Sequence, residues 1–289
     1  MTPSHPSRRR ALKRLLLGGG GLAAGVGVYA WQIEPRWVEV TNVDLPVRGL
    51  GSDLAGYRIV HVSDLHTCQG VSSSYLRRCM DRINAIGPDL VVVTGDLITG
   101  GLKTQIPTAA GLLGRLTARD GVLVSLGNHD YHCWTPGAIR WDIADRLTDA
   151  VTRAGCHVLR NERTVITRGR SGVNIIGLDD LLVDRCNPEG AFRGASRNLP
   201  VIALSHNPDS MGILRHWPVD VVLSGHTHGG QVCIPWIGPI LLPVDNRQYA
   251  AGLVRVDDKV LYVTRGLGHL MKVRFNCRPE ITVHRLCQA

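Results

Sequence analysis

The 289-residue sequence predicts an α/β fold of the α+β kind, in which strands and helices are mixed along one chain. The first observation behind this prediction is a set of short apolar runs that each end in polar residues, as strands buried on both faces do. The second is an amphipathic helical stretch between the first two runs, which gives the order strand, helix, strand. The apolar runs cover residues 57–66, 88–96, 121–130, 200–208 and 219–228.

The predicted helices follow from the spacing of apolar residues. In residues 72–87 a helical period places the apolar side chains on one face, and the serines at the start are able to cap the helix. That face consists of Leu76, Cys79, Met80, Ile83 and Ile86. A second helix is predicted within residues 137–155, after the third apolar run.

Shorter β segments complete the predicted sheet. Residues 157–180 indicate antiparallel strands with turn residues at 170–172, and residues 252–266 indicate two strands around Asp257 and Asp258. A last strand is predicted in residues 280–286. Parallel strands joined by helices and antiparallel hairpins together predict a mixed sheet, and no second domain boundary follows residue 45.

Charge and cysteine content exclude some classes of function. The formal net charge is +9, but five of the positive residues lie within the first 14, leaving 28 basic against 24 acidic residues. No block of Lys and Arg interleaved with aromatics occurs, so dedicated nucleic-acid binding is not expected. The eight cysteines show no CxxC spacing of a zinc ribbon, and most are expected to be small buried side chains.

The first 35 residues read as an export segment or an N-terminal membrane anchor. Arg8 and Arg9 resemble a twin-arginine transport signal, and an uncharged, glycine-rich run follows from Leu15 to Ala30. As a helix this run would reach about 24 Å, short of a hydrocarbon core of about 30 Å. Cleavage near Ala30 and retention as an anchor both stay open. Either way, residues 45–289 are expected outside, in the periplasm or on the outer face of the cytoplasmic membrane.

Polar side chains collect where the apolar runs end. The carboxyl ends of neighbouring parallel strands meet at one edge of an α/β sheet, so these side chains are expected to lie together. Each alone is more typical of a helix cap or a buried core histidine, but five such endings in one chain favour a metal site. They deliver Asp64, His66, Asp96, Asn128, His129, His206, His226 and His228. Carboxylate, imidazole and amide donors suit divalent Mn, Fe or Zn, and the absence of Cys argues against a purely structural zinc site.

The residues beside these candidates have two interpretations each. Gly95, Gly127 and Gly225 precede candidate ligands, where the lack of a Cβ permits tight turns and close approach to the metals. Asp130 either orients and charges His129 or caps a turn. A further set is left as substrate contacts or solvated surface residues: Asp179, Asp180, Arg265, His269 and Arg274.

The motifs SDLH, GDL, GNHD, SHNP and GHTHGGQ resemble those of the calcineurin-like metallophosphoesterase superfamily, and the resemblance covers residues 57–286. Within it, the export-like N-terminus and the later TRGLG and RFNCRPEI segments are similar to the bacterial membrane-associated YaeI/YkuE-type phosphodiesterases. The resemblance implies an αββα four-layer sandwich of two mixed sheets flanked by helices. It makes residues 45–289 a catalytic domain that holds two divalent metal ions.

The resemblance also implies a set of ligands. One metal would be bound by Asp64, His66, Asp96 and His228, and the other by Asp96, Asn128, His206 and His226. Asp96 would bridge the two ions, a bridging hydroxide would attack phosphorus, and His129 would protonate the leaving oxygen.

The implied activity is that of a phosphodiesterase acting on a phosphate ester, which could be lipid-linked, with membrane association expected. Two alternatives are a pyrophosphatase acting on a UDP-linked acylated sugar of the lipid A precursor type, and a non-catalytic metal-binding membrane scaffold. The scaffold alternative predicts loss of a ligand or of His129, and none is missing.

Overall fold

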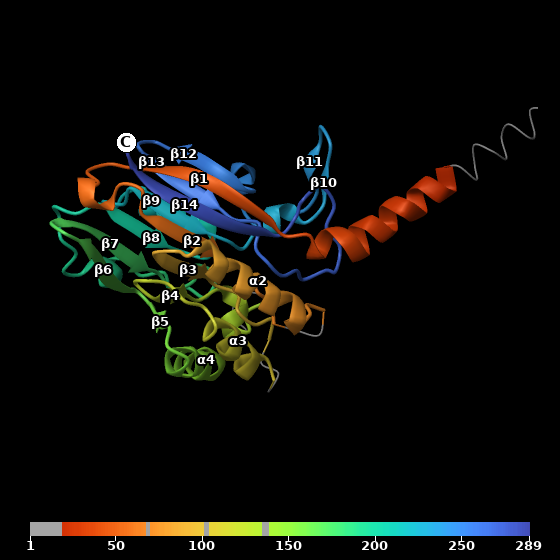
Figure 1. The fold of residues 1–289 in the computed structure, drawn as a ribbon, viewed down its shortest axis with the longest axis horizontal. Coiled ribbons are helices and arrows are strands. Elements are labelled where there is room, and N and C mark those ends of the chain that lie inside the picture. The colour runs from red at the N-terminus through yellow and green to blue at the C-terminus, as the bar shows by residue number, and fades with distance from the viewer. Residues whose placement is uncertain (1–18, 68–69, 101–103, 135–138) are drawn as a thin grey trace, which may run out of the picture.

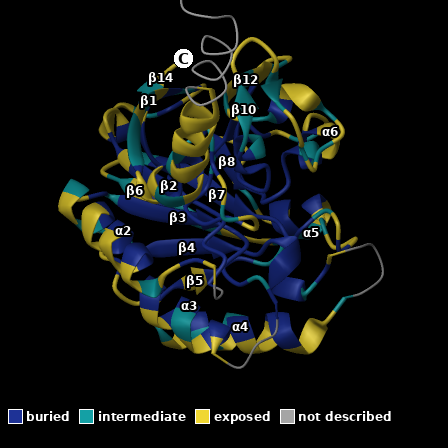
Figure 2. Cartoon of the chain, turned by 90° about the vertical axis from the view of Figure 1, so that its right-hand side faces the viewer, coloured by how far each residue is buried: buried dark blue, intermediate teal, exposed yellow. Residues whose placement is uncertain are grey.

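A computed structural model describes residues 19–67, 70–100, 104–134 and 139–289. Two six-stranded sheets pack face to face, and helices cover the outer face of each (Figures 1 and 2). Each sheet contains both parallel and antiparallel pairs. The four layers confirm the expected αββα sandwich.

The first sheet has the strand order β1-β14-β2-β3-β4-β5. Strands β2 to β5 are mutually parallel, β14 runs antiparallel to β2, and β1 runs parallel to β14. Its strands are β1 (Glu39–Val47), β2 (Arg58–Val62), β3 (Leu90–Thr94), β4 (Val122–Ser125), β5 (His157–Val158) and β14 (Glu280–Gln288).

The second sheet has the order β12-β13-β9-β8-β7-β6, with antiparallel pairs at both edges. Its strands are β6 (Glu162–Arg168), β7 (Ser171–Gly177), β8 (Val201–Leu204), β9 (Val221–Ser224), β12 (Gly252–Val256) and β13 (Lys259–Val263). The turn at Asp257 and Asp258 is confirmed, whereas β6 and β7 join at residues 169–170 rather than 170–172. A separate hairpin consists of β10 (Cys233–Ile234) and β11 (Gly238–Pro239).

Three α-helices cover the first sheet, and two short ones cover the second. They are α2 (Ser73–Ile86), α3 (Gln105–Leu113), α4 (Trp141–Arg153), α5 (Pro188–Phe192) and α6 (Met211–Leu214). Helices α2 and α4 were predicted, but the serine cap was not formed: the Ser72 hydroxyl bonds to the Ser74 hydroxyl at 2.7 Å. The short helical turns are η1 (Tyr29–Ile33), η2 (Glu34–Arg36), η3 (Ser52–Leu54), η4 (Asn128–Tyr131), η5 (Pro208–Ser210), η6 (His228–Gly230) and η7 (Arg247–Tyr249).

The core forms three layers because strand side chains alternate between the two faces of each sheet. In β2, Val60 and Val62 pack against α2, whereas Ile59 lies between the sheets. In β9, Val222 packs toward α6 and Val221 faces the first sheet. Each such buried aliphatic side chain contributes about 1.5–3 kcal/mol, and together they hold the strand ends in fixed positions.

The N-terminal part of the described chain stands apart from the sandwich. Residues 19–28 are helical and exposed and project from the domain (Figures 1 and 2). Among the described residues, no helix has both the length and the hydrophobicity that a membrane span needs. Arg8 and Arg9 lie outside the described residues, and the division into export segment and domain stays a prediction. Strand pairing already begins at Glu39 in β1.

Candidate metal centre

The predicted site residues lie on the loops that leave β2, β3, β4, β8 and β9. All of their side chains are buried. The loop after β2 carries Asp64 and His66, the loop after β3 carries Asp96, the loop after β4 carries Asn128 and His129, the loop after β8 carries His206, and the loop after β9 carries His226 and His228. Parallel strands therefore bring residues more than 160 positions apart to one edge of the sandwich.

Five of these residues have a backbone conformation that L-amino acids rarely adopt. The φ angle is +54° at Asp64, +45° at His66, +53° at Asp96, +70° at His226 and +51° at His228. Non-glycine residues in the left-handed region cost about 1–3 kcal/mol each, and such strain clusters at functional sites. Each of these left-handed residues is itself a predicted ligand and lies just beyond a strand end.

At the glycines before the predicted ligands, a Cβ atom would overlap neighbouring atoms. A Cβ built on Gly127 would lie 2.3 Å from Asp96 Oδ1, and one on Gly225 would lie 1.9 Å from Ser63 Oγ. A Cβ on Gly95 would lie 2.7 Å from His206 Nδ1. These three glycines therefore permit tight packing among the predicted ligands, and their close approach to bound metals stays a prediction.

Asp64, His66 and His228 form the first group of converging donors. Their donor atoms all lie within 4.8 Å of one another. The Nε2 atoms of His66 and His228 are 3.1 Å apart, and Asp64 Oδ1 is 3.4 Å from His228 Nε2. Asp64 Oδ1 is buried and accepts no hydrogen bond from any described residue. Two imidazole nitrogens and a free carboxylate oxygen aimed at one point fit a divalent cation.

Asp96, His206 and His226 form the second group. His206 Nε2 lies 3.1 Å from Asp96 Oδ2 and 3.2 Å from His226 Nδ1. The far nitrogen of each ring is held by a backbone carbonyl: His206 Nδ1 donates to Thr94 O at 2.7 Å, and His226 Nε2 donates to Pro243 O at 3.0 Å. This arrangement fixes the tautomers, so that His206 presents Nε2 and His226 presents Nδ1 to the site.

Asp96 connects the two groups, and Asn128 offers a further oxygen donor. Asp96 Oδ2 is 3.6 Å from His66 Nε2 in the first group and 3.1 Å from His206 Nε2 in the second. The Asn128 amide donates from Nδ2 to Cys133 O at 2.8 Å, which orients its buried oxygen away from that contact. This oxygen has no hydrogen-bond partner among the described residues. It is therefore available as a neutral ligand.

Residues 57–230 match the family model for calcineurin-like phosphoesterases. The chain belongs to this family. The phosphoesterase is 31% identical to phosphodiesterase YaeI of Escherichia coli (strain K12), over 91% of this chain and 93% of that protein. It is 35% identical to metallophosphoesterase YkuE of Bacillus subtilis (strain 168), with 97% of each chain covered. These similarities confirm the subgroup resemblance.

A third relative has a different activity. UDP-2,3-diacylglucosamine pyrophosphatase LpxG of Chlamydia muridarum (strain MoPn / Nigg) is 31% identical, over 91% of this chain and 94% of that protein. Phosphodiesterase and pyrophosphatase relatives both cleave phosphoric esters or anhydrides. The phosphoesterase is accordingly a metal-dependent phosphoric ester hydrolase with two candidate metal-binding groups.

Burial and neighbouring charges set the protonation states in the site. Burial lowers the pKa of His66 and of His226 to about 3, because the charged imidazolium is disfavoured away from water. Neutral imidazole is the form that binds a metal ion. Burial and, secondarily, the Asp96 carboxylate raise the pKa of Asp64 to about 7, although His206 opposes this. A buried carboxylate without a counter-charge is what a bound cation would stabilise.

His129 and Asp130 have different surroundings in the phosphoesterase. The His129 ring meets Trp134 edge-on at 4.2 Å, and its buried Nδ1 has no partner among the described residues. Asp130 accepts hydrogen bonds from the backbone N–H groups of Gly127 at 3.0 Å and Ile98 at 3.1 Å. The turn-capping interpretation of Asp130 is therefore confirmed, and no bond joins it to His129 among the described residues.

Several side chains that we left as substrate contacts or surface residues are instead buried: Asp179, Asp180, His269 and Arg274. The Arg274 guanidinium donates to the carbonyls of Cys277 at 3.0 Å and Gly268 at 2.7 Å, and the Gly268 N–H donates to Asp64 O. Arg274 thus supports the loop behind Asp64. Surface placement was wrong for these four residues, because the fold supplies buried partners that composition does not reveal. Backbone carbonyls pair with Arg274 and His269, whereas the carboxylates of Asp179 and Asp180 accept from the Tyr131 hydroxyl and the Leu182 N–H.

Three groups that contact the outer ring nitrogens of the predicted histidine ligands were not predicted from the sequence. They are Thr94 O and Pro243 O, which orient His206 and His226, and Thr99 Oγ1, which lies 3.2 Å from His66 Nδ1. Two of the three are backbone carbonyls, which every residue carries. Only the position of Thr94 at the end of an apolar run could have indicated its role.

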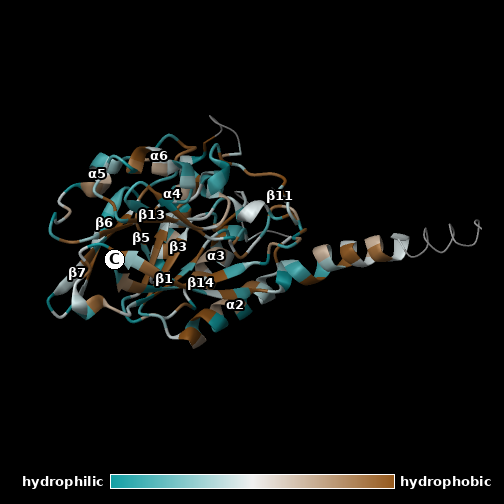
Figure 3. Ribbon diagram, turned by 90° about the horizontal axis from the view of Figure 1, so that it is seen from above, coloured by the Kyte–Doolittle hydropathy of each residue, from teal (hydrophilic) through white to brown (hydrophobic). Residues whose placement is uncertain are grey.

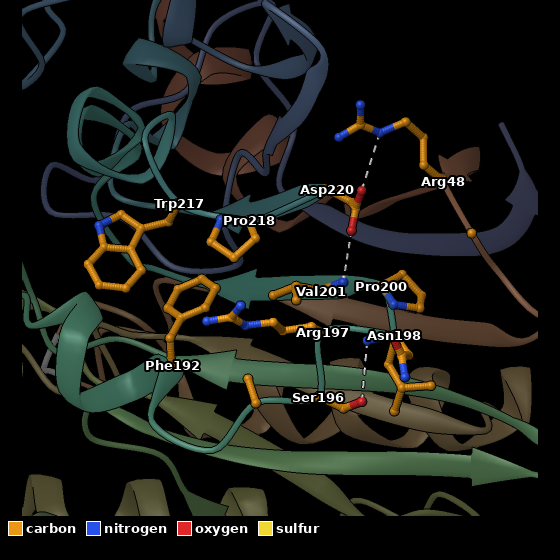
Figure 4. Close-up of a pocket in the computed structure, with 13 residues that line it drawn as sticks. Arg48, Phe192, Ser196, Arg197, Asn198, Pro200, Val201, Trp217, Pro218 and Asp220 are labelled. Carbon is orange, nitrogen blue, oxygen red and sulfur yellow. Dashed lines mark hydrogen bonds and ion pairs between the residues drawn. The ribbon is translucent and has the colours of Figure 1, made fainter.

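A cavity of about 850 Å³ lies at the opposite end of the second sheet (Figure 4). It opens beside the first residue of β8, Val201, and beside Asp220, which directly precedes β9. Phe192 and Trp217 line it with ring centroids 5.1 Å apart. The predicted ligands follow the other ends of the same strands, so none of them lines this cavity.

Proposed function

We propose that the phosphoesterase is a phosphodiesterase that works with two divalent cations. The observation that carries this proposal is the position of Asp96 Oδ2, 3.6 Å from His66 Nε2 and 3.1 Å from His206 Nε2. One carboxylate oxygen between two groups of donors suits a shared ligand, which two neighbouring cations need to offset their repulsion.

The proposed ligand set uses every converging donor. Asp64, His66, Asp96 and His228 would hold one cation, and Asp96, Asn128, His206 and His226 would hold the other. Mixed nitrogen and oxygen donors without thiolates suit Mn, Fe or Zn. Bound there, two such cations would supply Lewis-acid activation of a phosphoryl group and of a nucleophilic water.

The chain's own residues supply orientation and a proton. The carbonyls of Thr94 and Pro243 keep the lone pairs of His206 and His226 directed into the site. His129, held by its backbone N–H bond to Asp96 Oδ1 at 3.0 Å, is proposed to give its ring proton to the departing alkoxide. The Trp134 ring limits its rotation.

A second candidate activity is hydrolysis of a UDP-linked acylated sugar. The observation that favours it is the similarity to LpxG, which extends over 91% of the chain rather than over the motifs alone. The two candidates share the same proposed ligands and differ in the substrate. Both allow a lipid-linked phosphate ester.

The proposal includes export. Arg8 and Arg9 precede a weakly hydrophobic, glycine-rich run, as in signals for the transport of folded proteins. Residues 1–35 would act as export segment or anchor, and residues 45–289 as the catalytic domain. The active site would then lie in the periplasm or on the outer face of the cytoplasmic membrane.

A substrate panel tests the proposed activity. The purified full chain is given alkyl phosphodiesters, phosphomonoesters, UDP-2,3-diacylglucosamine and a phospholipid, with Mn, Fe, Zn and Mg supplied separately. Preferential, metal-dependent hydrolysis of diesters supports the proposal. Preference for the UDP-linked sugar selects the second candidate, and no hydrolysis by protein that has bound both cations would favour the scaffold alternative.

A further inference from the structure

The hairpin β10–β11 presents large apolar side chains to solvent. Trp236 is 103% exposed and Ile237 is 74% exposed, and both lie in the turn between the strands. Ile240 and Leu241, directly after β11, are also exposed. A projecting turn that holds a fully exposed tryptophan beside an isoleucine gains nothing for folding in water. Such a surface is typical of a binding site.

A second loop extends this surface. Leu270, Met271 and Val273 are exposed and flank Lys272. Gln231, which precedes the hairpin, donates from Nε2 to the carbonyls of Met271 at 2.9 Å and Val273 at 3.0 Å. The hairpin and the loop are therefore one unit. We call its exposed side chains the apolar rim: Trp236, Ile237, Ile240, Leu241, Leu270, Met271 and Val273.

The N-terminal helix leaves the domain beside the apolar rim. The Arg274 N–H donates to Ala30 O at 2.9 Å, and the Lys272 ammonium lies 5.0 Å from the centre of the Trp31 ring. Figures 1 and 3 show the hairpin and the helix at the same end of the molecule, and Figure 3 shows apolar turns along the helix. Leu22 and Val28 on that helix are exposed.

The apolar rim also adjoins the candidate metal centre. Gln231 lies three positions after His228 in the sequence. At the other end of the hairpin, Pro243 O accepts the hydrogen bond from His226 Nε2 at 3.0 Å. The segment that carries the hairpin is thus bounded at both ends by contacts to predicted ligands. The polar end of an amphiphile bound at the rim would then lie next to the site.

The chemistry of the surroundings favours a lipid bilayer over a protein partner. Tryptophan side chains are enriched at membrane interfaces, where the ring lies among headgroups. Lys272 is partly exposed, Arg36 and Arg247 are exposed, and positive residues near apolar side chains suit anionic headgroups. The sequence before the helix, residues 8–14, adds five further positive charges.

We propose that the apolar rim inserts into the surface of an anionic lipid bilayer and holds the metal centre against the headgroups. This inference rests on the proposed phosphodiesterase activity. It adds that the substrate is an amphiphile embedded in that bilayer. The exposed tryptophan would lie among the headgroups and acyl carbons. The phosphate ester of a neighbouring amphiphile would then reach the site without leaving the membrane.

Trp236 serves as its own reporter in the test. The full chain is bound to vesicles of phosphatidylglycerol and brominated phosphatidylcholine, and the fluorescence quenching is measured for wild type and Trp236→Phe. The difference between the two gives the quenching of Trp236 alone, although Trp31 and the other tryptophans are present. We expect a large Trp236 contribution, because bromine quenches only at close range.

Matched variants distinguish membrane binding by the rim from membrane binding by the N-terminal helix. All of the variants keep that helix. Ile240→Ser/Leu241→Ser removes apolar side chains from the rim, and Ile213→Ser/Leu253→Ser removes side chains that are 39% and 40% exposed elsewhere. The rim variant is expected to lose most of the Trp236 quenching, and the control variant to keep it. No Trp236 quenching in wild type, or equal quenching in both variants, would overturn the inference.

Two further measurements test whether the rim binds a second copy of the chain and whether the variants keep their hydrolytic activity. Sedimentation without vesicles detects self-association: a wild-type dimer that the rim variant abolishes, with no Trp236 quenching, assigns the rim to a second copy. Hydrolysis of soluble bis-p-nitrophenyl phosphate is expected to be equal in all variants. If no variant hydrolyses any phosphodiester, the proposed function fails while the quenching result on the rim stands.

Discussion

The ring nitrogens Nε2 of His66 and His228 lie 3.1 Å apart in a buried environment, and Asp64 Oδ1 faces the same point without a hydrogen-bond donor. At most one proton can lie between the two nitrogens. That proton joins the two nitrogens in a single hydrogen bond and leaves the carboxylate oxygen without a partner, which is unfavourable in a protein interior. A bound cation would accept a lone pair from each of the three atoms.

Metal stoichiometry should depend differently on the two groups. We expect two bound cations per wild-type chain, one in His228→Asn, and weakened binding of both in Asp96→Asn, since Asp96 Oδ2 lies beside ligand nitrogens of both groups. Elemental analysis after dialysis against excess Mn or Zn measures this. Loss of both cations in His228→Asn, with an intact fold by circular dichroism, would contradict two separable sites.

His129 and Asn128 should have separate effects. His129→Ala is expected to keep both cations and to lose about 10²–10⁴-fold in rate on an alkyl phosphodiester, because an alkoxide needs a proton to leave. It should retain a larger fraction on a p-nitrophenyl ester, whose leaving group is stable without one. Asn128→Ala should lower both metal affinity and rate. Equal losses of His129→Ala on both substrates would remove His129 from the acid role.

A single methyl group should displace a predicted ligand. In Gly127→Ala the new Cβ would lie 2.3 Å from Asp96 Oδ1, so we expect weakened metal binding and little activity. Gly111→Ala on α3 is the matched control, because nothing lies within 4 Å of its Cβ. That control should be more stable by about 0.5–1 kcal/mol. Thermal unfolding and metal titration of the two variants test the pair.

After a chelator has removed any bound metal, acid should lower the free energy of unfolding of the protein, because of His284. Burial lowers its pKa to about 3, whereas an unfolded histidine has a pKa near 6.5. Below about pH 6.5 the unfolded chain takes up a proton that the folded chain does not, so stability falls as the pH drops toward 3. Above pH 6.5 both states are neutral and the effect vanishes.

His284→Phe isolates this contribution. The slope of the unfolding free energy between pH 6.5 and pH 5 should be smaller in the variant by up to about 1.4 kcal/mol per pH unit. Urea unfolding at each pH measures the slope. His157→Gln changes an exposed histidine and should leave it unaltered; an equal slope in His284→Phe and wild type would contradict the prediction.

Export should require the paired arginines. Arg8→Lys/Arg9→Lys is expected to keep the protein in the cytoplasmic fraction, since transport signals of this kind depend on arginine. Arg77→Lys/Arg78→Lys on the exposed face of α2 is the matched control and should not change the distribution. Cell fractionation shows the outcome, and normal export of the first variant would exclude the twin-arginine assignment.

The sequence predicted the parts of the fold in which pattern and burial agree. The five central strands and helices α2 and α4 have continuous apolar runs or one apolar face. Helix α3 was missed because Pro107 and Gly111, both poor helix formers, interrupt a short apolar segment. Strand β1 was missed because it alternates only weakly between buried and exposed residues. Its place beside β14 depends on contacts more than 200 residues away.

In the candidate site, too, some residues could be predicted from the sequence and others could not. Its donors could be predicted because they end apolar runs and parallel strands bring those ends together. The carbonyls that orient His206 and His226 could not, since a backbone carbonyl carries no sequence signature. Arg274 was misplaced for a related reason: only the folded loop gives a buried guanidinium its partners.

The positive φ angles at Asp64, His66, Asp96, His226 and His228 affect how mutants of this protein should be interpreted. An alanine at any of these positions would remove a donor and also destabilise the turn, so its effect would combine two unrelated losses. Asparagine tolerates this backbone conformation and leaves the turn intact. Alanine scanning would therefore exaggerate the apparent contribution of these five residues, and asparagine substitutions give the more accurate ranking.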